Sequence, residues 1–243
     1  MMSILTTTQL SLRINDKIIC QSANLTFHPG EIWGVLGANG SGKTTLLHTL
    51  AGLHNSYQGN IQLHGQTFKK LTPKRIAQSI GLLFQDLPLL FPQTVLEYCL
   101  TSRFPHRHYF QKTTAQDQQA VLQALQQMHL EHYLHRSVLA LSGGEKRRLM
   151  IAALLAQQPE IYLLDEPNNH LDRRHLTRML QCFQQRVNTT GALVIMSLHD
   201  VHLAQQFCQR VLLLFPNGIV KVGSTQTLLT DTHLQALYEC ETI

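Results

Sequence analysis

The fold of this chain is decided by the stretch Gly37-Ala38-Asn39-Gly40-Ser41-Gly42-Lys43-Thr44. An apolar run over residues 32–36 precedes it and leucines at helical spacing follow it, so we expect the stretch to join a buried strand to a helix. Its glycines allow backbone conformations that other residues avoid, and successive N–H groups can then point at phosphate oxygens. The positive end of the following helix adds to this attraction. The stretch therefore predicts a phosphate-binding loop.

Two side chains at the end of the phosphate-binding loop suit the outer phosphates of a nucleotide. Lys43 supplies a mobile positive charge, and the hydroxyl of Thr44 is placed to bind a magnesium ion. The strand before the loop and the helix after it weigh against an ordinary glycine-rich turn. Many nucleotide hydrolases share such a loop, so the class of protein must be read from the rest of the chain.

Composition restricts the class further. The chain has 243 residues, of which 44% are hydrophobic, enough for one domain with a subdomain. Its apolar runs are far shorter than the roughly 20 residues that cross a bilayer, and no secretory signal is visible, so we expect a cytosolic protein. Its five cysteines are scattered, without Cys-x-x-Cys spacing, which disfavours a disulfide framework and a zinc site. The net charge of +5 lies in separate clusters and predicts no nucleic-acid partner, although it suits an anionic membrane surface.

Short apolar runs alternate with amphipathic segments along the chain, which indicates an α/β fold. Hairpins are predicted over residues 9–27 and 211–222, and a short strand pair over 57–66. Prolines at 88, 92 and 105 suggest a subdomain boundary. The remaining predicted strands are 32–36, 80–84, 161–164 and 193–196, and the predicted helices follow Thr44, Thr114, Glu145 and Asp200 or span 176–187 and 225–238.

Two further motifs stand next to predicted elements. Leu141-Ser142-Gly143-Gly144-Glu145 opens a helix and offers a hydroxyl and N–H groups as a second anion-binding element. Asp165-Glu166 follows a buried strand, where an acidic pair is the usual partner of a phosphate-binding loop. Hydrolysis of a nucleotide needs charge neutralisation, an aligned water and a proton acceptor, and Glu166 is the candidate acceptor.

Together with Gln85, His199 and the stretch Asn169-His170-Leu171-Asp172, these motifs resemble the nucleotide-binding domain of ABC transporters in order and spacing. The resemblance covers nearly the whole chain, and the Leu-Ser-Gly-Gly-Glu motif ahead of an Asp-Glu strand is highly specific. It implies one domain over residues 1–243 with a P-loop NTPase (RecA-like) core. An antiparallel β subdomain would share residues of about 1–86 and 159–243 with that core, and an inserted α-helical subdomain would take about 87–158.

The resemblance implies ATP and Mg²⁺ as cofactors and assigns roles to single residues. Glu166 would polarise the attacking water, His199 would contact the γ-phosphate, and Gln85 would reach the metal and couple the site to the helical subdomain; with Lys43 these form the catalytic set. The metal ligands would be Thr44, Gln85 and Asp165. The nucleotide-binding residues would be Gly37, Asn39, Gly40, Ser41, Gly42, Lys43, Thr44, Thr45, Ser142, Gly143, Gly144 and Asp172.

In the resembled family the second anion-binding element contacts ATP that is held by the opposite subunit. Two copies would therefore sandwich two nucleotides head to tail, with Asp172 at the seam of a homodimer. Many members also stack adenine on an aromatic residue of the N-terminal hairpin, but here the corresponding positions are Arg13 and Ile14. We expect the guanidinium of Arg13 to stack on the base instead.

The stretches Thr94-Val95-Leu96-Glu97 and Ser102-Arg103-Phe104-Pro105-His106 resemble the ATPases of importers for iron-siderophores, haem and cobalamin. That subtype implies transmembrane permease subunits, an indirect periplasmic binding protein, and a place on the cytoplasmic face of the inner membrane. Ser102, where that group has glycine, and Asn168-Asn169-His170 depart from its pattern. An exporter ATPase, or a soluble ABC protein that acts on the ribosome or nucleic acid, is the alternative, although such soluble proteins carry two cassettes or a coiled-coil insertion. The transported substrate and the permease stay open.

Overall fold

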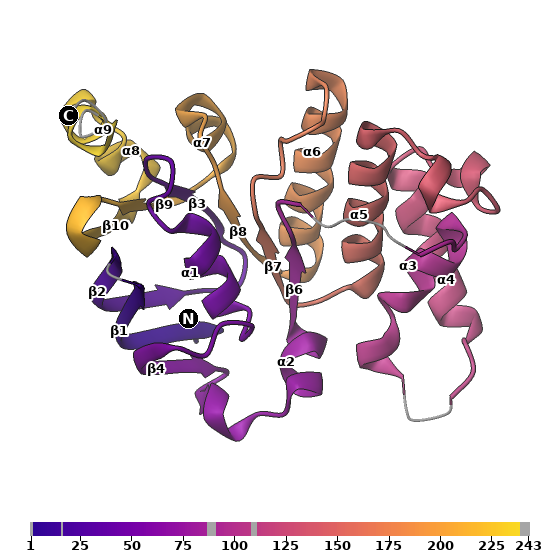
Figure 1. Ribbon diagram of the computed structural model, residues 1–243, viewed down its shortest axis with the longest axis horizontal. Coiled ribbons are helices and arrows are strands. Elements are labelled where there is room, and N and C mark those ends of the chain that lie inside the picture. Colours follow the sequence, from indigo (N-terminus) through magenta and orange to yellow (C-terminus); the bar gives the residue numbers. More distant parts are fainter. Residues whose placement is uncertain (1, 16, 87–90, 108–110, 239–243) are drawn as a thin grey trace.

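The computed structural model describes residues 2–15, 17–86, 91–107 and 111–238 (Figure 1). Pro88, one of the prolines that suggested a boundary, lies outside the described residues. The described chain forms two sheets flanked by helices, which confirms the predicted α/β class with an antiparallel part. No described helix combines the length and the apolar character that a membrane crossing requires.

The larger sheet has the strand order β10-β9-β3-β8-β7-β6. All its neighbouring strands are parallel except β9 and β10, which form the predicted closing hairpin. Every residue of β3, β7 and β8 is buried, as expected of parallel strands covered on both faces. The strands are β3 (Ile32–Leu36), β6 (Ile80–Leu83), β7 (Ile161–Leu164), β8 (Leu193–Ser197), β9 (Arg210–Leu214) and β10 (Val220–Ser224).

The smaller sheet is antiparallel, with the order β2-β1-β4-β5. It consists of β1 (Leu5–Ile14), β2 (Lys17–Phe27), β4 (Tyr57–Leu63) and β5 (Gln66–Thr67), so the predicted N-terminal hairpin is confirmed and starts four residues earlier than its pattern indicated. Phe27 of β2 packs on Trp33 of β3, with ring centroids 4.7 Å apart. This contact packs the hairpin against the larger sheet near the start of β3.

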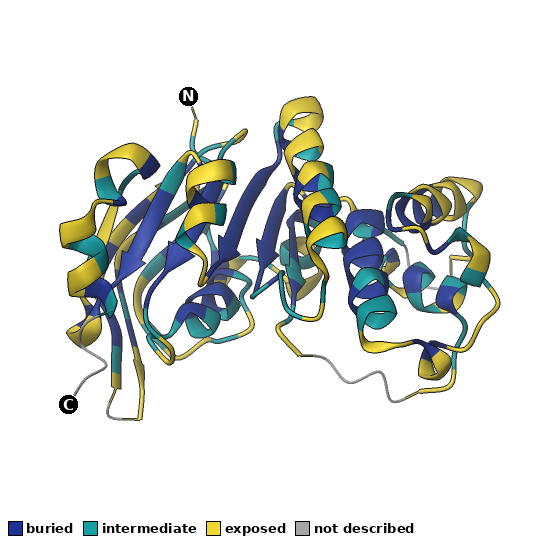
Figure 2. Cartoon of the chain, turned by 90° about the horizontal axis from the view of Figure 1, so that it is seen from above, coloured by how far each residue is buried: buried dark blue, intermediate teal, exposed yellow. Residues whose placement is uncertain are grey.

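Two apolar clusters fill the space on the two faces of the larger sheet. Leu163 and Leu164 are neighbours in β7 but belong to different clusters, because successive side chains of a strand point to opposite faces. One cluster joins the sheet to helix α1 (Lys43–Leu50) and the antiparallel strands, the other to α6 (Arg173–Thr190) and α7 (Val201–Phe207). Figure 2 shows the strands buried between helices whose outer faces are exposed.

Three helices gather at one end of the molecule: α3 (Val95–Thr101), α4 (Ala115–Gln127) and α5 (Gly143–Gln157) (Figure 1). Helix α4 begins with a capping box formed by Thr114 and Asp117. Its buried stripe runs through Ala120, Val121, Ala124 and Leu125, whereas Leu122 lies outside that stripe and is 45% exposed. The bounds of 87–158 for a separate helical subdomain stay a prediction.

Several short elements escaped the sequence patterns. Helices α2 (Pro73–Ser79) and α3 are each seven residues long, too short for a clear apolar period, although Thr72 with the following proline is a helix-start signal for α2. Helix α1 ends at Leu50, and Leu53 lies beyond its end and is 57% exposed. The C-terminal helical segment is divided into α8 (Thr225–Leu228) and α9 (Asp231–Tyr238), and the 3₁₀ turns are η1 (Phe68–Lys70), η2 (Phe104–His106), η3 (Glu131–Tyr133), η4 (Val138–Ala140) and η5 (Pro216–Gly218).

A buried ion pair ties the helices at this end together. Arg103 Nε lies 2.9 Å from Asp117 Oδ1, and Arg103 Nη1 also donates to the carbonyl of Ala156 at 2.9 Å. Burial acts to raise the pKa of Asp117, but hydrogen bonds from Arg103 and Thr114 outweigh it and lower that pKa from 3.8 to about 2. The carboxylate is therefore charged in the folded protein at neutral pH.

Replacing Asp117 with asparagine is expected to lower the free energy of unfolding by about 3 kcal/mol, because it leaves the buried Arg103 guanidinium without its counter-charge. The wild type should lose about 2 kcal/mol as the pH falls from about 5 towards 2, since the folded pKa lies below the unfolded one. The variant should lose less over that range. Urea unfolding at several pH values measures both effects, with Asp231→Asn on α9 as the control. Equal acid sensitivity of wild type and Asp117→Asn would contradict the argument.

Candidate functional site

The phosphate-binding loop leaves β3 and enters α1 as predicted. Gly40 and Gly42 have φ angles of +68° and +102°. A Cβ at Gly42 would lie 2.4 Å from Cγ2 of Ile19, so this position needs glycine both for its backbone angle and for the close approach of β2. Lys43 Nζ donates to the carbonyl oxygens of Gly37 and Ala38, at 2.8 Å and 3.1 Å. The ammonium group is thus held inside the curve of the loop.

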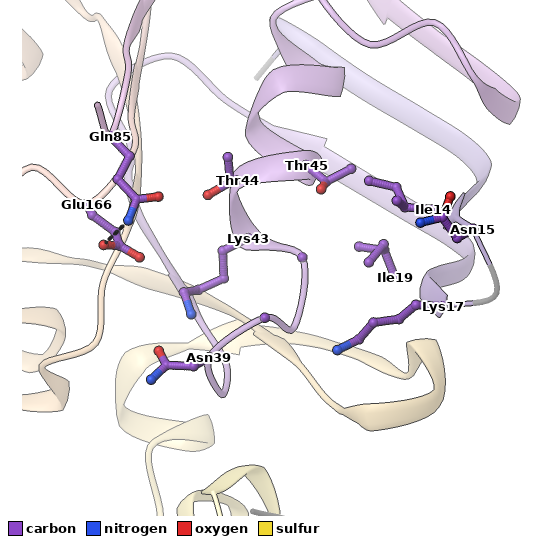
Figure 3. A pocket seen from close by; sticks show the side chains of 12 residues that line it. Ile14, Asn15, Lys17, Ile19, Asn39, Lys43, Thr44, Thr45, Gln85 and Glu166 are labelled. Carbon is purple, nitrogen blue, oxygen red and sulfur yellow. Dashed lines mark hydrogen bonds between the residues drawn. The ribbon is translucent and has the colours of Figure 1, made fainter. Parts of the chain in front are cut away.

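A cleft of about 670 Å³ opens beside this loop (Figure 3). One wall comes from the turn of the N-terminal hairpin and another from the segments that follow β6 and β7, so segments far apart in the chain meet here. The predicted site residues that line it are Asn39, Gly40, Gly42, Lys43, Thr44, Thr45, Gln85 and Glu166, together with Ile14, Asn15, Lys17 and Ile19.

The Glu166 carboxylate is the centre of a hydrogen-bond cluster at the edge of the cleft. His199 Nε2 lies 2.6 Å from its Oε1. Gln85 Nε2 and Asn169 Nδ2 both donate to its Oε2 at 2.8 Å, and Figure 3 shows the bond from Gln85. Since β6, β7 and β8 are parallel neighbours, their carboxyl ends bring Gln85, Glu166 and His199 to one edge of the sheet. The structure therefore joins three of the four predicted catalytic residues directly.

Opposing effects act on the pKa of Glu166. Partial burial raises it, but hydrogen bonds from His199 and Asn169 and the positive charge of Lys43 lower it by more, so the pKa lies below its ordinary value. The carboxylate is therefore ionised at neutral pH and able to accept a hydrogen bond from water. That is the state a general base requires before reaction.

Asp165 lies behind this cluster and is fully buried. Its Oδ1 accepts from Ser197 Oγ at 2.8 Å, whereas its Oδ2 has no hydrogen-bond partner among the described residues. A buried carboxylate oxygen without a donor suits a cation, and oxygen ligands are those that magnesium prefers. With the Thr44 hydroxyl and the Gln85 side chain on the cleft, the residues present fit a magnesium ion. In the described part of the chain, His, Cys, Asp and Glu side chains form no cluster of three that would hold another metal.

The other predicted nucleotide-binding residues lie away from the cleft lining. Ser142 caps α5, with its Oγ 3.3 Å from the Glu145 N–H, and Asp172 caps α6 through the His175 N–H at 2.8 Å. A Cβ added at Gly144 would lie 3.3 Å from the carbonyl oxygen of His170. The caps of α5 and α6 therefore belong to one exposed region. Gly37 and Ser41 belong to the loop itself without lining the cleft. The chain on its own does not bring Ser142 to Gly144 to its phosphate-binding loop.

Sequence reasoning missed two residues of the site. Asn169 was given no role in the site by the sequence analysis, yet its amide donates to the Glu166 carboxylate. Arg147 was given no role by the sequence analysis, yet it is buried and donates to the main-chain carbonyls of Phe84 and Glu166. Position 169 lies three residues after Glu166, a spacing at which side chains on a tight turn meet, so this signal was available. Nothing in the pattern around Arg147 separated it from its exposed neighbours.

Arg13 does not line the cleft in this structure, which disfavours the expected stacking of its guanidinium on the base. Its Nε donates to the carbonyl of Asn15 at 3.0 Å, and Arg13 lines a different pocket, together with Ile18 and Tyr57. The cleft wall next to the loop is made instead by Ile14, Ile19 and Lys17 (Figure 3). Alternation along a strand explains the difference, because Arg13 and Ile14 point to opposite faces.

Replacing Ile14 with tyrosine is expected to tighten ATP binding about fivefold, because an aromatic ring on this wall can stack on the base. Arg13→Ala should leave the affinity unchanged, since Arg13 lies outside the cleft. Equilibrium binding of a fluorescent ATP analogue to each variant measures both. Weaker binding in Arg13→Ala with no gain in Ile14→Tyr would show that the base lies on the other side of the hairpin.

The comparisons with known proteins agree with this geometry. The sequence pattern described as ABC transporter matches residues 20–169, which include the phosphate-binding loop, the 141–145 motif and the Asp165-Glu166 pair. The chain belongs to the ABC transporter family. It is accordingly an ATP-binding protein of the ATPase type, and the reading of its motifs as an ABC nucleotide-binding domain is confirmed.

Relatives of this ABC protein extend over nearly its full length. The iron(3+)-hydroxamate import ATP-binding protein FhuC of Bacillus subtilis is 31% identical over 99% of this chain and 89% of its own. The hemin import ATP-binding protein HmuV of Pseudomonas fluorescens is 34% identical over 96% and 92%. Among solved structures, a metal-chelate type ABC transporter in an inward-facing conformation matches with a TM-score of 0.84 and 30% identity, covering 97% of this chain and 89% of that one. This similarity confirms the P-loop NTPase fold.

Proposed function

We propose that this chain is the ATP-hydrolysing subunit of an ABC importer for a metal chelate, of the iron-siderophore, haem or cobalamin class. The observation that carries the enzymatic part is the Glu166 carboxylate, held ionised by His199 and Asn169 at the edge of the cleft that the phosphate-binding loop lines. The names and full-length similarity of the FhuC and HmuV proteins support the importer class.

The residues divide the work of hydrolysis among them. Loop N–H groups and Lys43, whose ammonium is poised inside the loop, hold the phosphates of ATP. Glu166 accepts a proton from the water that attacks the γ-phosphorus as the bond to the β–γ bridging oxygen breaks. His199 orients Glu166 and contacts the γ-phosphate. Thr44, Asp165 and Gln85 would hold Mg²⁺, which neutralises charge on the phosphate oxygens.

We propose that a homodimer closes the site. Ser142, Gly143 and Gly144 begin helix α5 on an exposed surface, with the Ser142 N–H donating to the Glu145 carboxylate, and they lie off the cleft of their own chain. A second copy placed head to tail would bring this element onto the nucleotide, with Asp172 near the seam. The phosphate-binding loop is then half of a complete site.

The partner in the membrane would be a permease pair on the inner membrane, with this chain on its cytoplasmic face and a periplasmic binding protein supplying substrate. The segment after Gln85 supports a docking surface there, because Phe91 and Phe104 are 74% and 59% exposed. Aromatic side chains are enriched at protein–protein interfaces relative to the rest of the surface.

Capture of the tagged chain from its native membranes tests the proposal. A polytopic membrane protein should copurify, and proteoliposomes containing the complex should take up a ferric siderophore, haem or cobalamin only with ATP. Outward transport would instead favour an exporter. Copurification with ribosomes, and without any membrane protein, would contradict the proposal and favour the soluble alternative.

A further inference from the structure

Arg147 connects the two segments that carry the proposed catalytic side chains. It lies in the first turns of α5 and is 3% exposed. Its Nη1 donates to the carbonyls of Phe84 and Gln85 at 2.5 Å and 3.1 Å. Its Nη2 donates to the carbonyls of Asp165 and Glu166 at 3.0 Å and 2.6 Å. One guanidinium group therefore holds two consecutive peptide carbonyls on each side.

These bonds begin where the pairing of the sheet ends. The register of β6 and β7 ends with Leu83 beside Leu164, and one further backbone bond runs from the Asp165 N–H to the Leu83 carbonyl at 2.9 Å. Beyond it, no backbone hydrogen bond joins the described residues 84–86 to residues 166–168. Arg147 supplies donors to main-chain carbonyls of both segments instead.

The segment after β7 needs such support. Glu166 has a φ angle of +42°, in the left-handed region that residues with a Cβ avoid. Its N–H donates to Ser197 Oγ at 2.8 Å while its carbonyl accepts from Arg147. The main chain on both sides of the proposed base is thus held by side chains of two other elements, and only the arginine also reaches the Gln85 segment.

Arginine is the residue type this position requires. Its planar group presents five N–H donors in a rigid fork. Lysine presents one compact ammonium, which cannot bond to the carbonyls of both segments in the same way. Arg147 is also carried by the helix that Ser142 caps. Because a helix moves as a rigid element, a displacement at residues 142–144 moves the fork as well.

We propose that Arg147 is a positioning residue for ATP hydrolysis, which ties the segments of Gln85 and Glu166 to the start of α5. Contact of Ser142 to Gly144 with nucleotide on a second copy then sets the placement of the base. The inference rests on the roles proposed above for Gln85 and Glu166. It adds a physical link between the element that meets the other subunit and the side chains that act within this one.

The test compares Arg147→Lys and Arg147→Gln with Arg148→Lys in the full chain. Arg148 is the matched control, because its Nη1 donates to the carbonyls of Met128 and His129, away from the cleft. We expect kcat for Mg-ATP to fall about 100-fold in both Arg147 variants, since small misplacements of catalytic groups have effects of this size. The dissociation constant for ATP should stay unchanged, and Arg148→Lys should behave as wild type.

Hydrogen exchange gives a readout that does not depend on activity. The amides of Asp165, Glu166 and Asn169 are all hydrogen-bonded in this region, and they should exchange faster in the Arg147 variants. The amide of Leu198, which bonds to the Val35 carbonyl in the sheet, should not change. Normal protection at 165–169, or an unchanged kcat, would overturn the proposal. The proposal would also be overturned if the variants lost protection throughout the chain and lost ATP binding as well. That result would show that Arg147 is needed for folding in general. If Glu166→Gln is fully active, the proposed function fails instead, whatever the exchange result.

Discussion

Replacing Glu166 with glutamine is expected to lower kcat for ATP about 1000-fold and to leave ATP binding intact, because general-base catalysis contributes gains of this order. The amide has the shape of the carboxylate. Its oxygen can accept from Gln85 and Asn169 as Oε2 does. Its NH₂ can donate to Nε2 of His199 in the tautomer in which that nitrogen carries no hydrogen. The cluster therefore persists without a group that can take a proton from water.

The measurements are kcat at saturating Mg-ATP, equilibrium ATP binding, and the molecular mass in solution with and without ATP. The variant should accumulate as an ATP-bound dimer, since the nucleotides are not consumed. Glu160→Gln is the matched control, because Glu160 lies at the opposite end of the same strand and pairs with His64 at 2.8 Å. Wild-type turnover in Glu166→Gln would remove Glu166 from its proposed role.

Replacing Ser142 with aspartate is expected to lower kcat about 100-fold while the monomer still binds ATP, since one lost electrostatic contact to the reacting group has effects of this size. Aspartate is as good a helix cap as serine, so it can still accept from the Glu145 N–H and keep α5 intact. Its negative charge would face the phosphates of the nucleotide on a second copy. The loss should therefore come from failed closure and not from unfolding.

Dimer formation is best measured in the Glu166→Gln background. Adding Ser142→Asp to that background should prevent ATP from driving dimer formation. Ser224→Asp, a change at the cap of α8, serves as the control and should leave the dimer in place. A Ser142→Asp chain that loses ATP binding as a monomer would place Ser142 in its own cleft. Normal turnover would show that the opposite subunit does not use this element.

Much of what the structure shows of the site could be predicted from local sequence patterns. The phosphate-binding loop could be predicted because its requirements are local: glycines where φ is positive, a strand before it and a helix after it. Gln85, Glu166 and His199 were each placed at a strand end, and parallel strands bring such ends to one edge. Their roles in catalysis and metal binding stay predictions.

Other features lay beyond any local pattern. Short helices such as α2 carry too few residues for a period, and the direction of the Arg13 side chain depends on the register of the hairpin. Asn169 gained its meaning only when the turn after β7 brought its amide to the carboxylate. Each of these depends on packing against segments distant in the chain.

The sequence by itself determined the family of this protein, the phosphate-binding loop and the candidate base, because each is written in contiguous residues whose conformation is local. Only the tertiary structure decided that Ser142 to Gly144 lie off their own cleft and that Arg147 joins the segments of Gln85 and Glu166. The contacts of Arg147 join it to Glu166, 19 positions away in the chain, and to Gln85, 62 positions away. Their geometry follows from how α5 packs against the ends of β6 and β7.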